Sequence, residues 1–87
     1  MIVSVIPFAQ RRMLKLKRRY PDLPKLIDDV VGLYLKNPRS SKLKLHKLND
    51  QNDYWSMSLK YDLRLVFIYE RDEITIVNIG SHDEVYR

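Results

Sequence analysis

Hydrophobic residues recur at helical spacing in the first part of this chain and at every second position in the last part. Segment 2–6 is a short β-branched run that ends at Pro7, which predicts a strand. Apolar residues then recur every three or four positions over 9–20 and 23–34, which predicts two amphipathic helices. Tyr20-Pro21-Asp22 separates them because the residue before a proline avoids the α region, and Asp22 is expected to cap the second helix. This part of the chain therefore predicts a strand followed by a helical hairpin.

The spacing of apolar residues changes to two after residue 53. Three alternating segments, each typical of a half-buried strand, lie at 55–61, 63–70 and 74–79. Arg71-Asp72 is expected to form the turn before the last of them. Because their connections are short, these strands should form an antiparallel meander.

The segment 38–53 between the helices and these strands is polar and predicts a loop. Three leucines are its expected anchors in the core: Leu43, Leu45 and Leu48. The complete order, β-α-α-β-β-β, predicts a two-layer α+β fold in which the helical hairpin packs on one face of a mainly antiparallel sheet. The other face of the sheet is left free to carry a site.

Composition limits the classes of protein that this chain can be. Its 87 residues predict one domain, 1–87, and a hydrophobic fraction of 45% is typical of a folded globule. It has no cysteine, which excludes disulfides, thiolate catalysis and Cys-based zinc sites, and its two glycines exclude a glycine-rich phosphate loop. With 16 Lys+Arg against 11 Asp+Glu, the net charge of +5 favours a polyanion, an acidic protein or both as partners.

The first seven residues lack the basic lead and the long apolar run of a signal peptide. No stretch approaches the roughly 20 apolar residues of a membrane span. We therefore expect a soluble, cytoplasmic domain with no membrane partner.

The tail 79–87 concentrates polar chemistry after an apolar strand. Ser81 followed three residues later by Glu84 is typical of a capping box, which predicts a helical turn. On such a turn His82 and Tyr86 lie four residues apart on one face, and Asp83 and Arg87 lie on a neighbouring one. An imidazole, a phenol and a guanidinium gathered on one turn require a chemical explanation.

Three segments carry a resemblance to a known family: Lys17-Arg18-Arg19-Tyr20-Pro21-Asp22-Leu23, the strand Asp62-Leu63-Arg64-Leu65-Val66-Phe67, and the tail 79–87. In this order the chain resembles, over nearly its whole length, toxins of the RelE/ParE superfamily from bacterial and archaeal type II toxin–antitoxin modules. His82, four residues before Tyr86, and His46, in the loop before the sheet, are similar to histidines of the YafQ-like mRNA interferase branch. Leu63 stands where the family's strand usually carries an aromatic residue, and the tail lacks the extra basic residues of RelE proper.

The resemblance implies a RelE-like fold and an endoribonuclease that cleaves mRNA on the ribosome. Such a toxin arrests growth until a cognate antitoxin neutralises it in a hetero-oligomer. The same family also includes ParE-like toxins that poison DNA gyrase without cleaving RNA, and an inactive relative that only binds antitoxin is a further alternative. We expect no cofactor and no metal site, since two histidines without a recognisable acidic set are weak evidence for metal binding.

Metal-free RNA cleavage needs a base for the attacking 2′-hydroxyl, an acid for the leaving 5′-oxygen and positive charge on the phosphorane. Histidine suits both proton transfers because its pKa lies near neutrality, and an arginine fork can clamp a phosphate in two places. The candidate catalytic residues are His82, His46, Asp62, Arg64 and Tyr86. Asp62 is expected to orient a histidine or carry a proton, and Tyr86 to donate a proton or stack on a base. The candidate RNA-binding residues are Lys42, Lys44, Lys47 and Arg87.

Each candidate also has a structural interpretation. His82 can cap the turn through a backbone carbonyl, His46 can be an exposed bystander, and the lysines can form a solvated loop. Arg64 can form a cross-strand ion pair, and Tyr86 can close the edge of the sheet. The nuclease hypothesis therefore depends on geometry: the imidazole of His82 and the guanidinium of Arg64 must converge on one open, cationic hollow.

Overall fold

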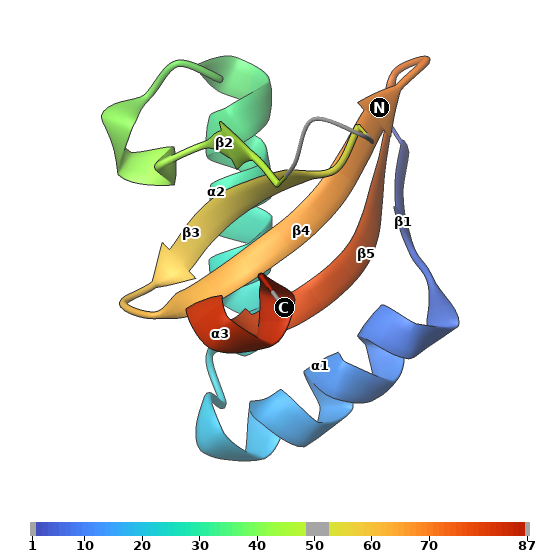
Figure 1. Ribbon diagram of the computed structural model, residues 1–87, viewed down its shortest axis with the longest axis vertical. Helices are drawn as coiled ribbons and strands as arrows, with labels where there is room; N and C mark the ends of the chain where they lie inside the picture. The colour runs from blue at the N-terminus through green and yellow to red at the C-terminus, as the bar shows by residue number, and fades with distance from the viewer. Residues whose placement is uncertain (1, 49–52, 87) are drawn as a thin grey trace.

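The computed structural model describes residues 2–48 and 53–86. Its elements in chain order are β1 (Ile2–Val5), α1 (Pro7–Arg19), α2 (Leu23–Lys36), the 3₁₀ turn η1 (Ser41–Leu43), β2 (His46–Lys47), β3 (Trp55–Lys60), β4 (Leu63–Glu70), β5 (Glu73–Ser81) and α3 (His82–Val85). The predicted α+β fold, with two helices packed on a mainly antiparallel sheet, is confirmed (Figure 1).

The sheet has the strand order β1-β5-β4-β3-β2. Strands β3, β4 and β5 form the predicted antiparallel meander, and the turn between β4 and β5 is at Arg71 and Asp72, both with positive φ. The first strand, β1, pairs in parallel with β5, Ile2 opposite Glu73. Helix α1 packs against β5 and α2 against β3. In Figure 1 α2 lies behind the sheet, whereas the short helix α3 lies in front of it.

The core lies between the sheet and the two long helices. The central strands supply fully buried residues such as Phe67, Met57 and Leu65, and α2 supplies Leu23 and Ile27. Each such side chain contributes about 1.5–3 kcal/mol when it leaves water. The predicted anchors of the segment before the sheet are also placed in or near this core: Leu43 is fully buried, Leu45 packs against the core and Leu48 is half-buried. The loop that they hold is therefore fixed close to β3.

Three local expectations differ from the structure. Asp22 stands at the N-cap of α2 but accepts no capping hydrogen bond; its φ of −85° and ψ of 6° turn the side chain away, and its carboxylate lies 3.7 Å from Nζ of Lys60. Tyr61, expected on the apolar side of a strand, lies in the β3–β4 turn with a φ of 46° and is 93% exposed. The segment expected as a plain loop contains η1 and β2, because His46 and Lys47 pair with β3. A strand of two residues is too short to show the alternation of apolar and polar residues that identifies a strand in a sequence.

Among residues 2–48 and 53–86, no helix is long and apolar enough to cross a membrane.

Candidate active site

Strand register decides which face of the sheet carries polar groups. Residues directly opposite each other in neighbouring strands share a face, so Arg64 of β4 lies on the same side as Ser58 of β3. The next cross-strand row on this side joins His46 of β2, Ser56 of β3 and Val66 of β4. The core residues Met57 and Leu65 are opposite each other in the row between, with their side chains on the other face. Arg64, Ser56 and His46 therefore meet on the face away from the core.

Arg64 is buried, with 6% of its surface exposed, and its hydrogen bonds hold it in a fixed orientation. Its Nε donates to Oγ of Ser56 at 2.8 Å, and its Nη2 donates to the backbone carbonyl of Lys44 at 2.9 Å. Lys44 has a φ of 46°, in the left-handed region, immediately before β2. Within the described part of the chain no carboxylate pairs with Arg64, so its partners are neutral and its positive charge is not cancelled. A buried cation of this kind is a candidate for binding an anion.

The imidazole of His46 lies beside this guanidinium. Its Nδ1 is 3.1 Å from the carbonyl oxygen of Lys44 and 3.4 Å from Nη2 of Arg64. Because a carbonyl can only accept, the proton of the neutral ring belongs on Nδ1, and both side chains donate to the same oxygen. Nε2 is then an acceptor, and it is hydrogen-bonded to the hydroxyl of Tyr86, which donates. The rings of His46 and Tyr86 are stacked, with centroids 5.4 Å apart.

The second histidine reaches the site from α3, which the predicted capping box begins. Oγ of Ser81 accepts from the backbone N–H of Glu84 at 3.3 Å, and the carboxylate of Glu84 accepts from the backbone N–H of Ser81 at 2.9 Å. The backbone bond from Ser81 is the main cause that lowers the pKa of Glu84 below its ordinary value, with further contributions from the Ser81 side chain and from Arg12. As the spacing predicts, His82 and Tyr86 meet on one face of this turn, with ring centroids 4.3 Å apart.

Asp62 contacts the backbone of His82 instead of its ring. The N–H of His82 is shared between the Asp62 carbonyl oxygen at 3.0 Å and its Oδ1 at 3.3 Å. The carboxylate near the imidazole belongs to Asp83, with Oδ1 3.9 Å from Nδ1 of His82. Asp62 thus ties α3 to the β3–β4 turn and orients His82 through its main chain.

The candidate RNA-binding lysines flank His46 in the chain. Lys42 lies in η1, Lys44 between η1 and β2, and Lys47 in β2, and all three side chains are exposed. Arg87 lies outside the described residues. Sequence reasoning missed three contributors to the site: Ser56, the carbonyl of Lys44, and Arg12, whose guanidinium binds Glu84. Of these only Ser56, a serine at a polar position of an alternating strand, leaves a signal in the sequence.

Four side chains thus form a continuous series, Arg64–His46–Tyr86–His82, from a buried guanidinium to an exposed imidazole. The two groups required to converge lie on one face of the sheet and are joined through His46 and Tyr86. In the described ranges no group of three or more histidine, cysteine, aspartate or glutamate side chains could hold a metal ion. The series can supply two imidazoles, a phenol and an uncancelled positive charge to one ligand.

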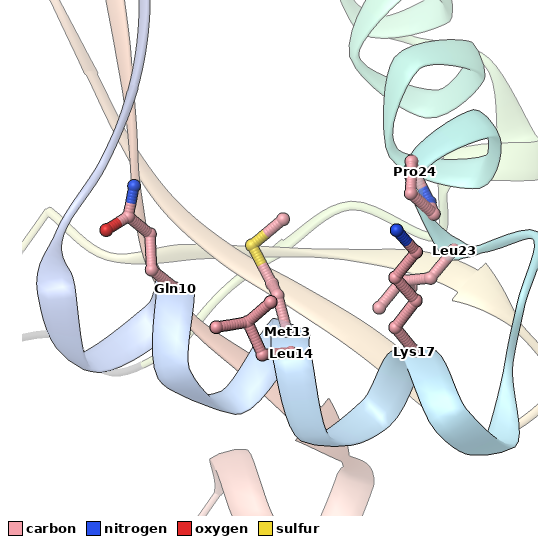
Figure 2. Close-up of a pocket in the computed structure, with 6 residues that line it drawn as sticks. All are labelled: Gln10, Met13, Leu14, Lys17, Leu23 and Pro24. Atoms are coloured by element: carbon pink, nitrogen blue, oxygen red, sulfur yellow. The ribbon is translucent and has the colours of Figure 1, made fainter.

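A second surface feature lies away from this series, between α1 and α2. It is a groove of about 410 Å³, lined by Gln10, Met13, Leu14, Lys17, Leu23 and Pro24. Figure 2 shows Met13 and Lys17 rising from α1 toward Leu23 and Pro24 at the start of α2. Leu14 at its edge is 70% exposed, which is unusual for a large apolar side chain next to other apolar residues.

The whole chain can be compared with known proteins. No protein-family model and no curated protein matches it. Among solved structures, it is similar to a metal-bound toxin from Helicobacter pylori, with 30% identity, a TM-score of 0.82 and 97% of each chain covered. It also shares its fold with YafQ in the E. coli DinJ-YafQ toxin-antitoxin complex, at 14% identity and a TM-score of 0.80 over 98% of this chain and 96% of that one. The YoeB/ParE toxin from Agrobacterium tumefaciens matches at 15% identity and a TM-score of 0.75, over 94% of this chain and 99% of that one. With this fold, these matches and the sequence motifs in their expected places, the chain belongs to the RelE/ParE superfamily of toxins, close to YafQ.

Proposed function

We propose that this chain, as a single domain over 1–87, is the toxin of a type II toxin–antitoxin module and acts in the cytoplasm as a ribosome-dependent mRNA endoribonuclease. The observation that carries the proposal is the contact series Arg64–His46–Tyr86–His82 on the face of the sheet opposite the core. It combines two proton-transfer groups with a cation that has no carboxylate partner among the described residues. A toxin that acted only by binding would not need this combination.

The proposed reaction is attack of an RNA 2′-hydroxyl on its adjacent phosphate. The 2′-oxygen forms a bond to phosphorus while its proton passes to a base, and the bond from phosphorus to the 5′-oxygen breaks as that oxygen receives a proton from an acid. The products are a 2′,3′-cyclic phosphate and a 5′-hydroxyl. Positive charge beside the phosphorane stabilises the transition state, and Arg64 supplies it.

The geometry suggests a division of roles between the two histidines. The side chain of His82 is 60% exposed, and its ring makes no hydrogen bond with the described residues. It can therefore reach a nucleotide directly. His46 has its Nε2 occupied by the Tyr86 hydroxyl and acts through that phenol. Asp62 keeps the main chain of His82 in place. Lys42, Lys44 and Lys47 contact phosphates along the RNA, and each contact that forms makes binding more sensitive to salt.

The test is to map the 5′ ends of mRNA after induction, in parallel with purified protein added to ribosomes programmed with mRNA. We expect new 5′ ends within coding regions, and a His82→Ala protein that cleaves about 10²–10⁴-fold more slowly while its folding is unchanged. Glu70→Gln is the control, because it changes an exposed side chain at the other end of β4 from Arg64. A well-folded His82→Ala protein with full activity would refute the role of His82. DNA breaks before any loss of mRNA would indicate gyrase poisoning instead, and normal growth at high expression would indicate an inactive relative.

The second part of the proposal is a cognate antitoxin that binds the α1–α2 side and forms a hetero-oligomer with the toxin. The groove beside Leu14 is mainly apolar, and the basic side chain that lines it is Lys17 of α1. An amphipathic segment with acidic residues complements both properties. Leu14→Glu should weaken binding of the antitoxin encoded beside this gene, whereas Leu35→Glu, at an exposed leucine of α2 outside the groove, should not. Equal binding by both variants would exclude the groove as the contact.

A further inference from the structure

Arg12 joins α1 to the end of β5 and to α3. Its Nε donates to the carbonyl oxygen of Ile79 at 2.8 Å, and its Nη2 lies 2.7 Å from a carboxylate oxygen of Glu84. The last residue pair between β1 and β5 is Val5 with Ile76, so Ile79 lies beyond the part of β5 that β1 covers. The guanidinium of Arg12 therefore hydrogen-bonds to the backbone of β5 just beyond the end of β1, and it also binds the carboxylate of Glu84, which caps α3.

Gly80 leaves the space that this guanidinium occupies. A Cβ at position 80 would lie 2.7 Å from Nη2 of Arg12 and 3.1–3.2 Å from atoms of Glu84. Gly80 does not have a positive φ, so its backbone conformation does not require glycine. The absence of a side chain at this position thus serves the contact between Arg12 and Glu84.

A helix of one turn needs contacts from outside to keep a fixed orientation. Helices much shorter than about 12 residues are unstable in isolation, and α3 spans only His82–Val85. Apart from its own capping box, α3 is held on one side by Asp62, which accepts from the N–H of His82, and on the other by Arg12, which binds Glu84. The rings of His82 and Tyr86 move with this turn.

We propose that Arg12 is a positioning residue for the candidate active site: by binding Ile79 and Glu84 it fixes α3 so that His82 and Tyr86 stay against His46. What the positioned rings do rests on the proposed function, but the positioning itself does not. An ordinary exposed ion pair contributes little to stability. This one is shielded mainly at Arg12, whose side chain is 26% exposed against 49% for Glu84, and its effect is on the orientation of two rings.

The experiment compares Arg12→Gln with Arg11→Gln by NMR. Arg11 is the neighbouring arginine of α1, exposed and without a hydrogen bond or ion pair to the described residues, so it is a matched control for charge. In Arg12→Gln we expect weaker cross-peaks between the rings of His46 and Tyr86 and faster exchange of the Tyr86 N–H, which is bonded to the His82 carbonyl. Arg11→Gln should keep both signals. If the protein cleaves RNA, Arg12→Gln should lower kcat by about 10-fold or more with KM little changed, because small misplacements of catalytic groups are costly.

Two further variants keep the proposal testable should Arg12→Gln fold poorly. Glu84→Gln keeps the shape of the capping side chain but removes the charge that Arg12 binds, and Gly80→Ala displaces the guanidinium without changing any charge. Both should loosen the same ring contacts. Unchanged ring contacts and N–H exchange in Arg12→Gln or in both further variants would overturn the positioning role, whether or not the protein cleaves RNA. Loosened contacts in a protein whose wild type cleaves no RNA would support the positioning role and reject the nuclease.

Discussion

Arg64 and His46 reach the candidate site from the sheet, whereas His82 and Tyr86 reach it from the single turn α3. The sheet half is fixed by strand register and by one backbone carbonyl, that of Lys44, which accepts from both side chains. The cap half is fixed by a capping box and by ties from Asp62 and Arg12. In the sheet half Arg64 is buried and His46 is exposed, and the two residues are distant in sequence. In the cap half His82 is exposed and Tyr86 is half-buried, and the turn that carries them begins with a local motif. The comparison implies that the guanidinium of Arg64 is rigid and that the rings of His82 and Tyr86 are more easily displaced.

Removing Arg64 should have the largest effect because it breaks the sheet half. Arg64→Ala leaves the buried Oγ of Ser56 without its donor and removes one of the two donors to the carbonyl of Lys44. We expect the free energy of unfolding to fall by about 2–4 kcal/mol, measured by urea denaturation. Arg18→Ala, at an exposed arginine of α1, is the control and should change it by less than about 0.5 kcal/mol. A loss in Arg64→Ala no larger than in the control would mean that the sheet half is not held as described.

Substitutions at two serines test whether the sheet half (Arg64 and His46) and the cap half (His82 and Tyr86) are disturbed separately. Ser81 caps α3, and Ser40 accepts from the N–H of Lys42 at the start of η1, next to the sheet half. Ser81→Ala should cost about 1 kcal/mol and disturb the NMR signals of His82 and Tyr86. Ser40→Ala should cost no more than that and disturb Lys44 and His46. Identical patterns of disturbance in the two variants would show that the site responds as one unit.

Gly32 provides a change that touches neither half. It lies inside α2, and a Cβ there would meet nothing within 4 Å. Gly32→Ala should therefore raise the free energy of unfolding by about 0.4–1 kcal/mol, since alanine favours the helix and restricts the unfolded chain. Thermal unfolding measures the gain. The ring signals of His82 and Tyr86 should remain those of the wild type, and a shift in them would mean that α2 is coupled to the cap half.

The smallest expected effect is the pH dependence of the stability that Glu84 contributes through the cap half. The pKa of Glu84 is lower in the folded protein than its ordinary value near 4.5. Its contribution to stability is therefore fully present above about pH 4.5 and is lost as the pH falls through the folded pKa. The stability difference between wild type and Glu84→Gln should shrink over this range in urea denaturations at several pH values. A difference that stays constant down to low pH would contradict the ionised Glu84 contact.

The sequence predicted what depends on local chemistry. Alternating and helical periods located the meander and both long helices, and Ser81 with Glu84 located α3. Features that depend on pairing between distant residues were not predicted. Strand β2 has two residues, and nothing in His46 and Lys47 themselves indicates that they pair with Ser56 and Trp55.

The same division applies to the site. His82 and Tyr86 could be predicted to meet because they lie four residues apart on one turn. His46, forty residues earlier in the chain, was a candidate only through the family resemblance, and its contact with Tyr86 depends on the pairing of β2 with β3. Arg12 gave no signal, because one arginine among six basic residues of α1 looks like any solvent-facing charge. Asp62 was expected to orient a histidine or to carry a proton, and the structure gives its contact to the backbone N–H of His82.

The parallel pairing of β1 with β5 determines the order in which parts of a newly synthesised chain can fold. Ile2 leaves the ribosome well before its partner Glu73 is made. Until then β1 has no neighbour, and α1 has no strand β5 on which to pack. Contacts between such distant residues are the slow part of folding. The outer edge of the sheet and the attachment of α1 through Arg12 should therefore form together, only after β5 has left the ribosome, and a chain that ends before β5 has neither.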